Sequence, residues 1–396
     1  MRIAVPKESI AGENRVAATP ETVEKLVRAG NEVFVQSGAG EAAGHPDAQY
    51  GDAGAQIKND APATVGAADA VVRVGKPSSE EIAALPEGSI LIGYLDPLTD
   101  DETKKSLAAR KISAFAMESI PRTTRAQSMD SLSSQATVSG YKSVLIAAVE
   151  SPKFLPMLTT AAGTVRPAKV FVIGGGVAGL QAIATARRLG AIVLGFDVRS
   201  AVREQVESLG AKFVEIDLGA DDAETSGGYA KELTDEQKQK QTELMSATVI
   251  DSDIVITTAA IPGRKAPMLI PAEVVEQMRP GSVIVDLAAE TGGNCALTRP
   301  GETIVSNGVK VVGPVNLPST MPLHASQLYA KNVSNLLELM IDEGRAVIDF
   351  DDEILAGACI THAGELAGDQ PFTSVKPAAA ASPEPVASPS GDGAAR

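Results

Sequence analysis

Residues 169–197 read KVFVIGGGVAGLQAIATARRLGAIVLGFD. The apolar run 170–173 is typical of a buried strand, a glycine-rich turn then opens a helical stretch ending near Gly190, and a second apolar run follows at 191–196. This order of segments predicts a complete βαβ unit rather than an isolated glycine motif. Because such a turn lets a pyrophosphate reach the N–H groups of the helix N-terminus, the stretch predicts a dinucleotide-binding domain.

Three glycines and one acid support this interpretation. We expect Gly174 to form the tight turn, Gly176 to let the backbone approach the pyrophosphate, and Gly179 to allow close packing of helix on sheet. Asp197 would accept hydrogen bonds from the ribose hydroxyls and repel a 2′-phosphate, which favours NAD(H) over NADP(H). Arg199 weakens this preference, since a nearby arginine accommodates a 2′-phosphate. A purely structural glycine turn is the alternative.

Composition limits the possible classes of protein. A length of 396 residues suggests two or three domains. The formal charge of −15 argues against nucleic acid or an anionic membrane surface as a partner. The two cysteines, Cys295 and Cys359, predict a reducing compartment, no disulfide framework and no metal site. With no signal segment and no apolar run of about 18 residues, we expect a cytoplasmic chain that does not itself span a membrane.

Strand patterns lie on both sides of the βαβ unit and predict two α/β domains. Those before it are 2–5, 32–35, 70–74, 89–94 and 111–116, with helical patterns such as 101–110 and one that starts after Thr19. Those after it are 212–216, 253–257, 282–287 and 310–312, followed by a helix over 324–340 whose apolar residues Leu328, Val333, Leu336, Leu337 and Met340 return the chain to the first domain.

The fold class that follows is α/β, with two Rossmann-like, doubly wound parallel sheets and a cleft between them. We expect residues 1–132 plus 322–372 to form a discontinuous first domain and 133–321 to form the dinucleotide-binding domain. The Ala, Pro and Ser-rich residues 373–396 predict a flexible tail. The polar insertion 219–240 predicts a mobile flap.

Residues 121–135, PRTTRAQSMDSLSSQ, precede a long helical stretch at 136–149 and would lie between the domains, where α/β enzymes bind ligands. At this point the chain resembles the soluble NAD(H)-binding component of proton-translocating nicotinamide nucleotide transhydrogenase, which is itself similar to alanine dehydrogenase. The resemblance runs from RIAVPKE at the N-terminus to AKNVSNLL before residue 338. The segments RAQSMD, LSSQ and SGGYAKE separate the transhydrogenases from the amino-acid dehydrogenases.

This resemblance implies roles for particular residues. It implies a catalytic set in the segment after residue 121, consisting of Arg122, Gln127, Asp130 and Ser133, with the serine on the nicotinamide carboxamide. It implies a mobile-loop tyrosine, Tyr229, that closes over the nucleotide. The other implied cofactor-binding residues are Gly174, Gly176, Val177, Ala178, Gly179, Asp197, Val198, Arg199, Thr258, Ala259, Ala260, Pro262, Leu287 and Asn294.

The resemblance also implies partners. The chain would be a homodimer that docks against an NADP(H)-binding beta subunit. A small transmembrane alpha subunit would complete the complex, so the chain would contact the inner face of the cell membrane only through its partners.

The residues themselves add a chemical argument. Hydride transfer between two nicotinamide rings requires positioning rather than acid–base catalysis. Amino-acid oxidation forms an imine and requires a proton-handling group. Alanine dehydrogenases carry a catalytic histidine after the strand that corresponds to 91–95, and this chain has Asp96 there. Its three histidines, His45, His324 and His362, lie elsewhere, which counts against alanine oxidation.

Several less specific interpretations remain open. Arg122 is also a plausible solvated loop charge, and Asp130 a plausible N-cap of the following helix. Arg15 and Arg73 resemble the carboxylate-binding pair of alanine dehydrogenase, but an interdomain contact explains them equally. Glu290, near that family's catalytic acid, favours a structural or nucleotide-side role. The alternative functions are an amino-acid dehydrogenase and a non-catalytic NAD-sensing module.

Overall fold

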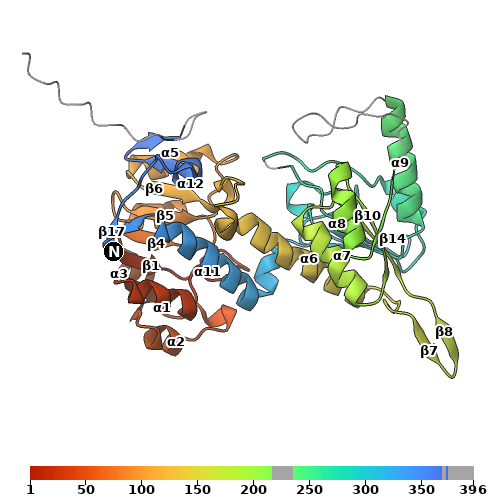
Figure 1. The fold of residues 1–396 in the computed structure, drawn as a ribbon, viewed down its shortest axis with the longest axis horizontal. Coiled ribbons are helices and arrows are strands. Elements are labelled where there is room, and N and C mark those ends of the chain that lie inside the picture. Colours follow the sequence, from red (N-terminus) through yellow and green to blue (C-terminus); the bar gives the residue numbers. More distant parts are fainter. Residues whose placement is uncertain (216–234, 262, 368–371, 373–396) are drawn as a thin grey trace, which may run out of the picture.

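This computed structural model describes residues 1–215, 235–261, 263–367 and 372, with the backbone alone for 235–241. Tyr229, Pro262 and the expected tail 373–396 therefore lie outside the described residues. Within the described ranges the chain forms two large sheets, each flanked by helices (Figure 1). None of the helices in these ranges is long and apolar enough to cross a membrane.

The first sheet has eight strands in the order β19-β18-β6-β5-β4-β1-β2-β3. Six of them are parallel: β1 (Arg2–Val5), β2 (Glu32–Gln36), β3 (Gln56–Lys58), β4 (Ala70–Val72), β5 (Ile90–Gly93) and β6 (Ser113–Ala116). The strands β18 (Cys359–His362) and β19 (Glu365–Leu366) extend the edge in antiparallel fashion, which the sequence pattern did not predict. The central strands are buried along their length because helices cover both faces.

Helices around this sheet follow the expected alternation. They are α1 (Pro20–Arg28), α2 (Asp47–Asp52), α3 (Ala61–Val65), α4 (Ser79–Ala84), α5 (Asp101–Ala109) and α12 (Glu353–Ala358). Thr19 occupies the expected N-cap position of α1, but its hydroxyl finds no partner among the described residues. Instead, the Thr22 hydroxyl accepts the Thr19 N–H at 3.0 Å.

Helix α11 (Pro322–Glu338) returns the chain to the first sheet as predicted. Val333, Leu336, Leu337 and Met340 enter the first hydrophobic core together with Tyr329. Leu328 is the exception among the expected apolar contacts, because its side chain is 38% exposed.

The second sheet has the strand order β11-β10-β9-β12-β13-β15-β14. Its parallel strands are β9 (Lys169–Ile173), β10 (Ile192–Phe196), β11 (Lys212–Phe213), β12 (Ile254–Thr257), β13 (Val283–Asp286) and β15 (Val309–Val312), with β14 (Thr303–Ser306) antiparallel at the edge. The parallel strands thus follow the 3-2-1-4-5-6 order of dinucleotide-binding sheets, whose ligands lie at the carboxyl ends near the first and fourth strands. The helices are α7 (Val177–Arg188), α8 (Arg203–Ser208), α9 (Asp235–Ile250) and α10 (Ala272–Glu276).

Helix α6 (Ser131–Glu150) runs from the first sheet to the second (Figure 1). It begins five residues earlier than the expected 136, so the expected domain boundary at 132/133 falls in its first turn. The contact with α7 is close, because a Cβ atom added to Gly140 would lie 2.2 Å from the carbonyl oxygen of Ala178.

Other elements were not expected from the sequence. A hairpin of β7 (Leu158–Thr160) and β8 (Gly163–Val165) projects from the second sheet's end of the molecule (Figure 1). A smaller hairpin pairs β16 (Ile341–Asp342) with β17 (Arg345–Ala346). Because α9 begins at Asp235, the last residues of the predicted flap 219–240 are helical.

Candidate functional site

The glycine-rich turn after β9 forms the centre of the candidate site. Gly174 has φ of +105°, which L side chains rarely adopt. A Cβ atom on Gly179 would lie 1.8 Å from the carbonyl oxygen of Gly174, so only glycine permits this approach of helix and turn. A Cβ atom on Gly176, by contrast, would have nothing within 4 Å, which leaves open space for a ligand against the backbone.

Helix α7 presents an uncapped N-terminus to this space. Its N-cap residue, Gly176, has no side chain to accept a hydrogen bond from the first turn, where Val177 is exposed and Ala178 half-buried. Arg187 and Arg188 in the last turn complement the helix dipole at the other end. Free N–H groups at the positive end of a twelve-residue helix match the charge and donor pattern that a pyrophosphate requires.

Asp197 follows β10 at the same edge of the sheet. Its Oδ2 accepts the Gly175 N–H at 2.7 Å, which ties it to the turn. Arg199 binds both oxygens, with Nε 2.9 Å from Oδ1 and Nη2 3.0 Å from Oδ2, and its N–H lies 2.8 Å from Oδ1. Burial raises the pKa of Asp197, but the bonds from Arg199 outweigh it and hold the pKa below its usual value. A ribose therefore competes with Arg199, whose side chain is 47% exposed and free to swing away.

Three further expected residues line the neighbouring loops. Val198 is 60% exposed beside Asp197. Ala260 is exposed after β12, where Thr258 Oγ1 lies 3.3 Å from the Ile173 and Gly174 carbonyl oxygens. Leu287 is half-buried, and its N–H donates to the Thr257 carbonyl at 2.9 Å. All lie beyond the carboxyl ends of β10, β12 and β13, where this fold binds ligands.

Asn294 supports the site from behind. Its side chain is fully buried, and Nδ2 donates to the carbonyls of Ala259 and Pro267 at 2.8 Å each. Oδ1 accepts the Ala259 N–H at 3.1 Å. Because both side-chain donors are spent on the loop after β12, the geometry gives Asn294 a positioning role rather than the expected direct contact.

Asp286, at the end of β13, was not singled out by the sequence. Its fully buried carboxylate accepts the N–H groups of Ala288, Asn294 and Cys295 at 3.0, 2.7 and 3.0 Å. The hydroxyls of Thr257 and Thr298 add bonds of 2.8 and 2.6 Å. An acid closing an otherwise apolar strand, VIVD, was the available signal. Asp286 thus fixes the course of the 287–298 loop.

The segment 121–130 is held at two points. Arg125 forms an ion pair with Asp352, the N-cap of α12, and the Ser128 carbonyl accepts the side-chain amides of Asn332 and Asn335 at 2.8 and 3.0 Å. Met129 is buried at 6% exposure in the first core, as the sequence suggested. The side chains of Arg122 and Gln127 remain exposed on this anchored segment. Polar groups on a rigid segment are pre-organised for a ligand.

Asp130 caps α6. Oδ1 accepts the Ser133 N–H at 2.9 Å, and Oδ2 accepts the Ser133 hydroxyl at 2.6 Å. Ser133 and Gly140 lie on one face of α6, two turns or about 10 Å apart, and Gly140 contacts Ala178 in the first turn of α7. The structure therefore brings Asp130 and Ser133 to the same side of the molecule as the glycine-rich turn.

The carboxyl edges of the two sheets approach each other near these residues. A Cβ atom on Gly263, after β12, would lie 3.1 Å from Cδ1 of Leu98, after β5. Residues from both sheets thus border the candidate site.

Arg15 and Arg73 lie in the first domain with internal carboxylates. Arg15 is 7% exposed, and its Nε and Nη2 donate to Glu13 at 2.8 and 2.7 Å. Arg73 is 3% exposed and lies 3.5 Å from Glu8 and 3.2 Å from Glu81. Its Nε has no partner in the described part of the chain. The sequence pattern did not single out these three acids, whose only signal was their charge.

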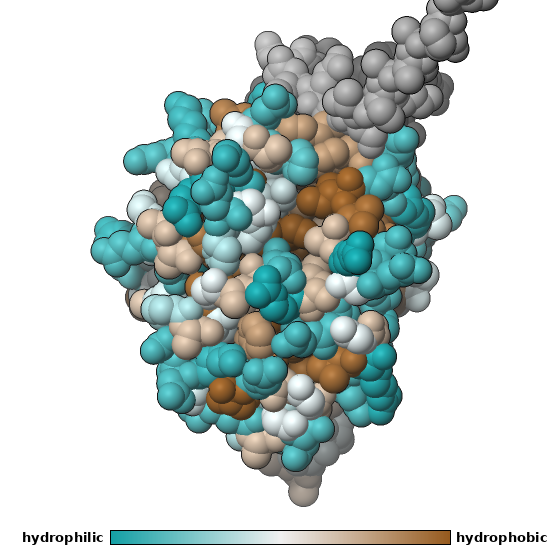
Figure 2. Space-filling model, turned by 90° about the vertical axis from the view of Figure 1, so that its left-hand side faces the viewer, coloured by the Kyte–Doolittle hydropathy of each residue, from teal (hydrophilic) through white to brown (hydrophobic). Residues whose placement is uncertain are grey.

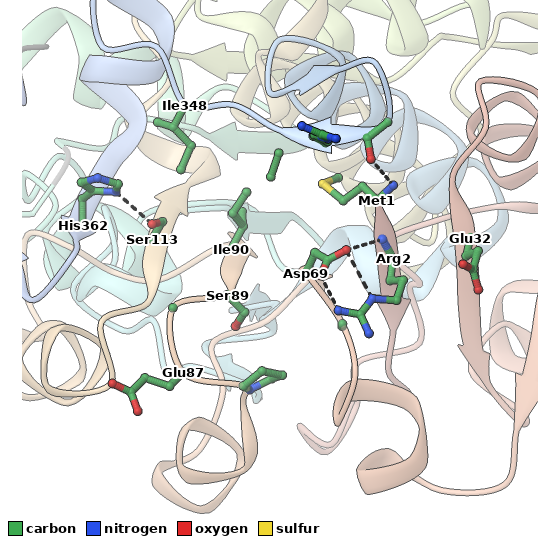
Figure 3. A pocket seen from close by; sticks show the side chains of 16 residues that line it. Met1, Arg2, Glu32, Asp69, Glu87, Ser89, Ile90, Ser113, Ile348 and His362 are labelled. Atoms are coloured by element: carbon green, nitrogen blue, oxygen red, sulfur yellow. Dashed lines mark hydrogen bonds and ion pairs between the residues drawn. The ribbon is translucent and has the colours of Figure 1, made fainter.

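A cavity of about 880 Å³ lies at the opposite, amino edge of the first sheet (Figure 3). Its walls include Met1, Arg2 paired with Asp69, and the Ser113 hydroxyl 2.9 Å from Nδ1 of His362. Figure 2, viewed from the side where the N-terminus lies in Figure 1, shows apolar residues gathered among hydrophilic ones on this face. None of the expected site residues that the structure describes lines this cavity, so it is separate from the candidate site.

No group of three or more His, Cys, Asp or Glu side chains in the described ranges is arranged to hold a metal ion. Cys295 and Cys359 are both free and buried. Burial raises the pKa of each thiol, that of Cys359 to about 12, which makes both inert at neutral pH.

Comparison with known proteins identifies the family. The family model described as alanine dehydrogenase/PNT, N-terminal domain, matches residues 4–139, and the corresponding C-terminal domain model matches 143–369. The chain belongs to the alanine dehydrogenase/PNT family. This confirms the resemblance inferred from the motifs.

Within the alanine dehydrogenase/PNT family, transhydrogenase subunits are more similar to the chain than alanine dehydrogenases are. An NAD(P) transhydrogenase alpha subunit of Rhodospirillum rubrum is 49% identical over 374 residues, covering 92% of this chain and 97% of that protein. Alanine dehydrogenase of Halomonas elongata is 31% identical over 373 residues, covering 92% and 94%. The crystal structure of transhydrogenase from Sinorhizobium meliloti has a TM-score of 0.82 at 42% identity and covers 93% of this chain and 99% of that one. The two-domain Rossmann-like fold is thereby confirmed.

Proposed function

We propose that the chain is the NAD(H)-binding component of a proton-translocating NAD(P) transhydrogenase, which exchanges hydride directly with NADP(H) held on a partner subunit. When bound, the nicotinamide supplies the hydride. The uncapped first turn of α7 would hold the pyrophosphate and Asp197 the adenosine ribose. Arg122, Gln127, Asp130 and Ser133 would orient the nicotinamide, and the loop carrying Tyr229 would close over it.

One observation carries the choice against a small-acid dehydrogenase. Nε, Nη1 and Nη2 of Arg15 all donate to this chain's own Glu13, Gln135 and Asn316. A substrate carboxylate would have to displace a buried internal one. Asp96, at the place of the dehydrogenase histidine, has a side chain 60% exposed and 3.5 Å from Lys76, so no imidazole is available there for imine chemistry.

The proposed homodimer is supported by the projecting hairpin. Its flanking residues Phe154 and Met157 are 58% and 63% exposed, and Leu158 and Val165 on its strands are 37% and 45% exposed. Apolar side chains exposed on a projecting arm favour burial against a second copy. We further propose that the complex includes an NADP(H)-binding beta subunit and a small transmembrane alpha subunit. The chain would then be a cytoplasmic, peripheral component at the inner face of the membrane.

Hydride transfer is tested by mixing the chain with a separately made NADP(H)-binding component. With deuterium at C4 of NADH, we expect the label to appear in the reduced NADP analogue, stereospecifically and without loss to water. The chain alone should form no NADH from NAD⁺ and alanine. Label in the solvent, or alanine-dependent NADH formation without a partner, would support the dehydrogenase alternative. Nucleotide binding with no transfer to any acceptor would support the sensing module.

Nucleotide choice gives a second prediction. Asp197→Ala should weaken NADH binding by about 1–3 kcal/mol, because ribose hydroxyls lose their acceptor. Arg199→Ala should retain NADH binding and weaken NADPH binding further, since it removes the cation that shields Asp197. Fluorescence titration measures both affinities. Arg203→Ala, which removes a neighbouring arginine paired with Glu215, is the matched control. Tighter binding of NADPH than of NADH by the unmodified chain would refute the assignment.

A further inference from the structure

Within the described ranges, the chain passes between the two sheets at two places. The first is α6, which carries Gln135, and the second is the segment 313–321, which leads from β15 in the second sheet to α11 beside the first. The angle between the two domains is therefore set where these connections pass the first domain.

Arg15 contacts both connections at once. Its Nη1 donates to Oε1 of Gln135 at 2.9 Å, and its Nη2 donates to Oδ1 of Asn316 at 3.1 Å. Gln135 is in turn anchored to α11, because its Nε2 donates to the Ala325 carbonyl at 3.1 Å. One guanidinium thus links the start of α6, the crossing segment and the first domain.

Glu13 holds this guanidinium in place. Besides accepting from Arg15, its Oε2 accepts Nδ2 of Asn316 at 2.9 Å. Burial raises the pKa of Glu13, but the Arg15 bonds outweigh it and leave the pKa below its usual value. The side chains of Arg15 and Glu13 are only 7% and 3% exposed. A buried pair of this kind adds little net stability, but removal of one partner leaves a costly unpaired charge, so the pair imposes a single geometry.

The same junction reaches the candidate site. Asn316 adopts a left-handed conformation with φ of +43°, and its N–H donates to Oε1 of Glu290 at 3.2 Å. Glu290 lies in the 287–298 loop, which also carries Asn294. Asn14 reinforces the contact, since its N–H donates to the Ser319 hydroxyl at 2.7 Å. Movement at the junction would therefore shift the nucleotide loop relative to residues 121–130.

We propose that Arg15 is a positioning residue that fixes the angle between the two domains, and so aligns the 121–130 segment with the nucleotide cradle for transfer. The effect on transfer rests on the function proposed above, whereas the effect on the domain angle does not. Arg15 acts through Gln135 and Asn316 and touches no reacting atom.

The test compares Arg15→Met with Arg15→Lys and with the double variant Glu13→Gln/Arg15→Met, which removes the stranded acid. Spin labels are introduced on the two domains through Asp52→Cys and Lys212→Cys, both exposed, while the native cysteines are buried. Double electron–electron resonance then reports the interdomain distance distribution. Arg2→Met, which breaks an ion pair at the opposite edge of the first sheet, is the control.

We expect both methionine variants to broaden the distance distribution and to slow single-turnover transfer at least about tenfold, with NADH affinity changed less than about threefold. Arg15→Lys should be intermediate, because an ammonium cannot reproduce the forked contacts. An unchanged distribution in both methionine variants would overturn the proposal, whatever the transfer rate. A broadened distribution in a system where even the unmodified chain transfers no hydride would support the domain clamp and refute the proposed function.

Discussion

Asp286→Ala is expected to lower the free energy of unfolding by about 3–6 kcal/mol, since each buried donor left without an acceptor costs about 1–3 kcal/mol. The substitution strands the backbone N–H groups of Ala288, Asn294 and Cys295 in a fully buried position. A water molecule that entered the space left by the carboxylate could replace only part of these bonds. Urea unfolding, followed by circular dichroism, measures the change.

The same substitution should weaken nucleotide binding, because the 287–298 loop and the Ala259 turn depend on one another through Asn294. Asp52→Ala removes an exposed acid at the end of α2 and is the matched control, with an expected change within about 0.5 kcal/mol. If Asp286→Ala cost less than about 1 kcal/mol, the buried network would not be what holds the loop.

Asp130→Ala should have the largest effect on transfer among the proposed orienting residues. It removes the N-cap of α6, worth about 1 kcal/mol, and also the acceptor of the Ser133 hydroxyl. We expect a loss of more than about tenfold in the transfer rate, with a much smaller change in NADH affinity. Stopped-flow measurement with the NADP(H)-binding component reports the rate.

Asp130→Asn separates capping from charge, because asparagine caps helices about as well as aspartate. If charge orients the nicotinamide, Asp130→Asn should restore stability without restoring the rate. Gln127→Ala provides an independent check on an exposed side chain, which should slow transfer by about tenfold at unchanged stability. Equal losses of binding and rate in these variants would reduce the segment to ordinary binding or structural residues.

The site was predictable where local pattern was enough. The three glycines, Asp197 and the capping role of Asp130 follow from residues near them in sequence, and the structure places them as expected. The full extent of the interaction between Asp197 and Arg199 was not predictable, because a side chain's rotamer depends on its surroundings. The positioning role of Asn294 was missed, since its partners Ala259 and Pro267 lie 35 and 27 residues away.

The sequence by itself determined the βαβ unit, the alternation of strands and helices, and the return of α11 to the first domain, because hydrophobic periodicity and turn chemistry act over a few residues. Only the tertiary structure decided the antiparallel edge formed by β18 and β19, the network around Asp286, and the contacts of Arg15. Those features join groups up to 301 residues apart, as between Arg15 and Asn316. A buried charge is tolerated only where the fold supplies partners, and no local pattern specifies which distant residues will supply them.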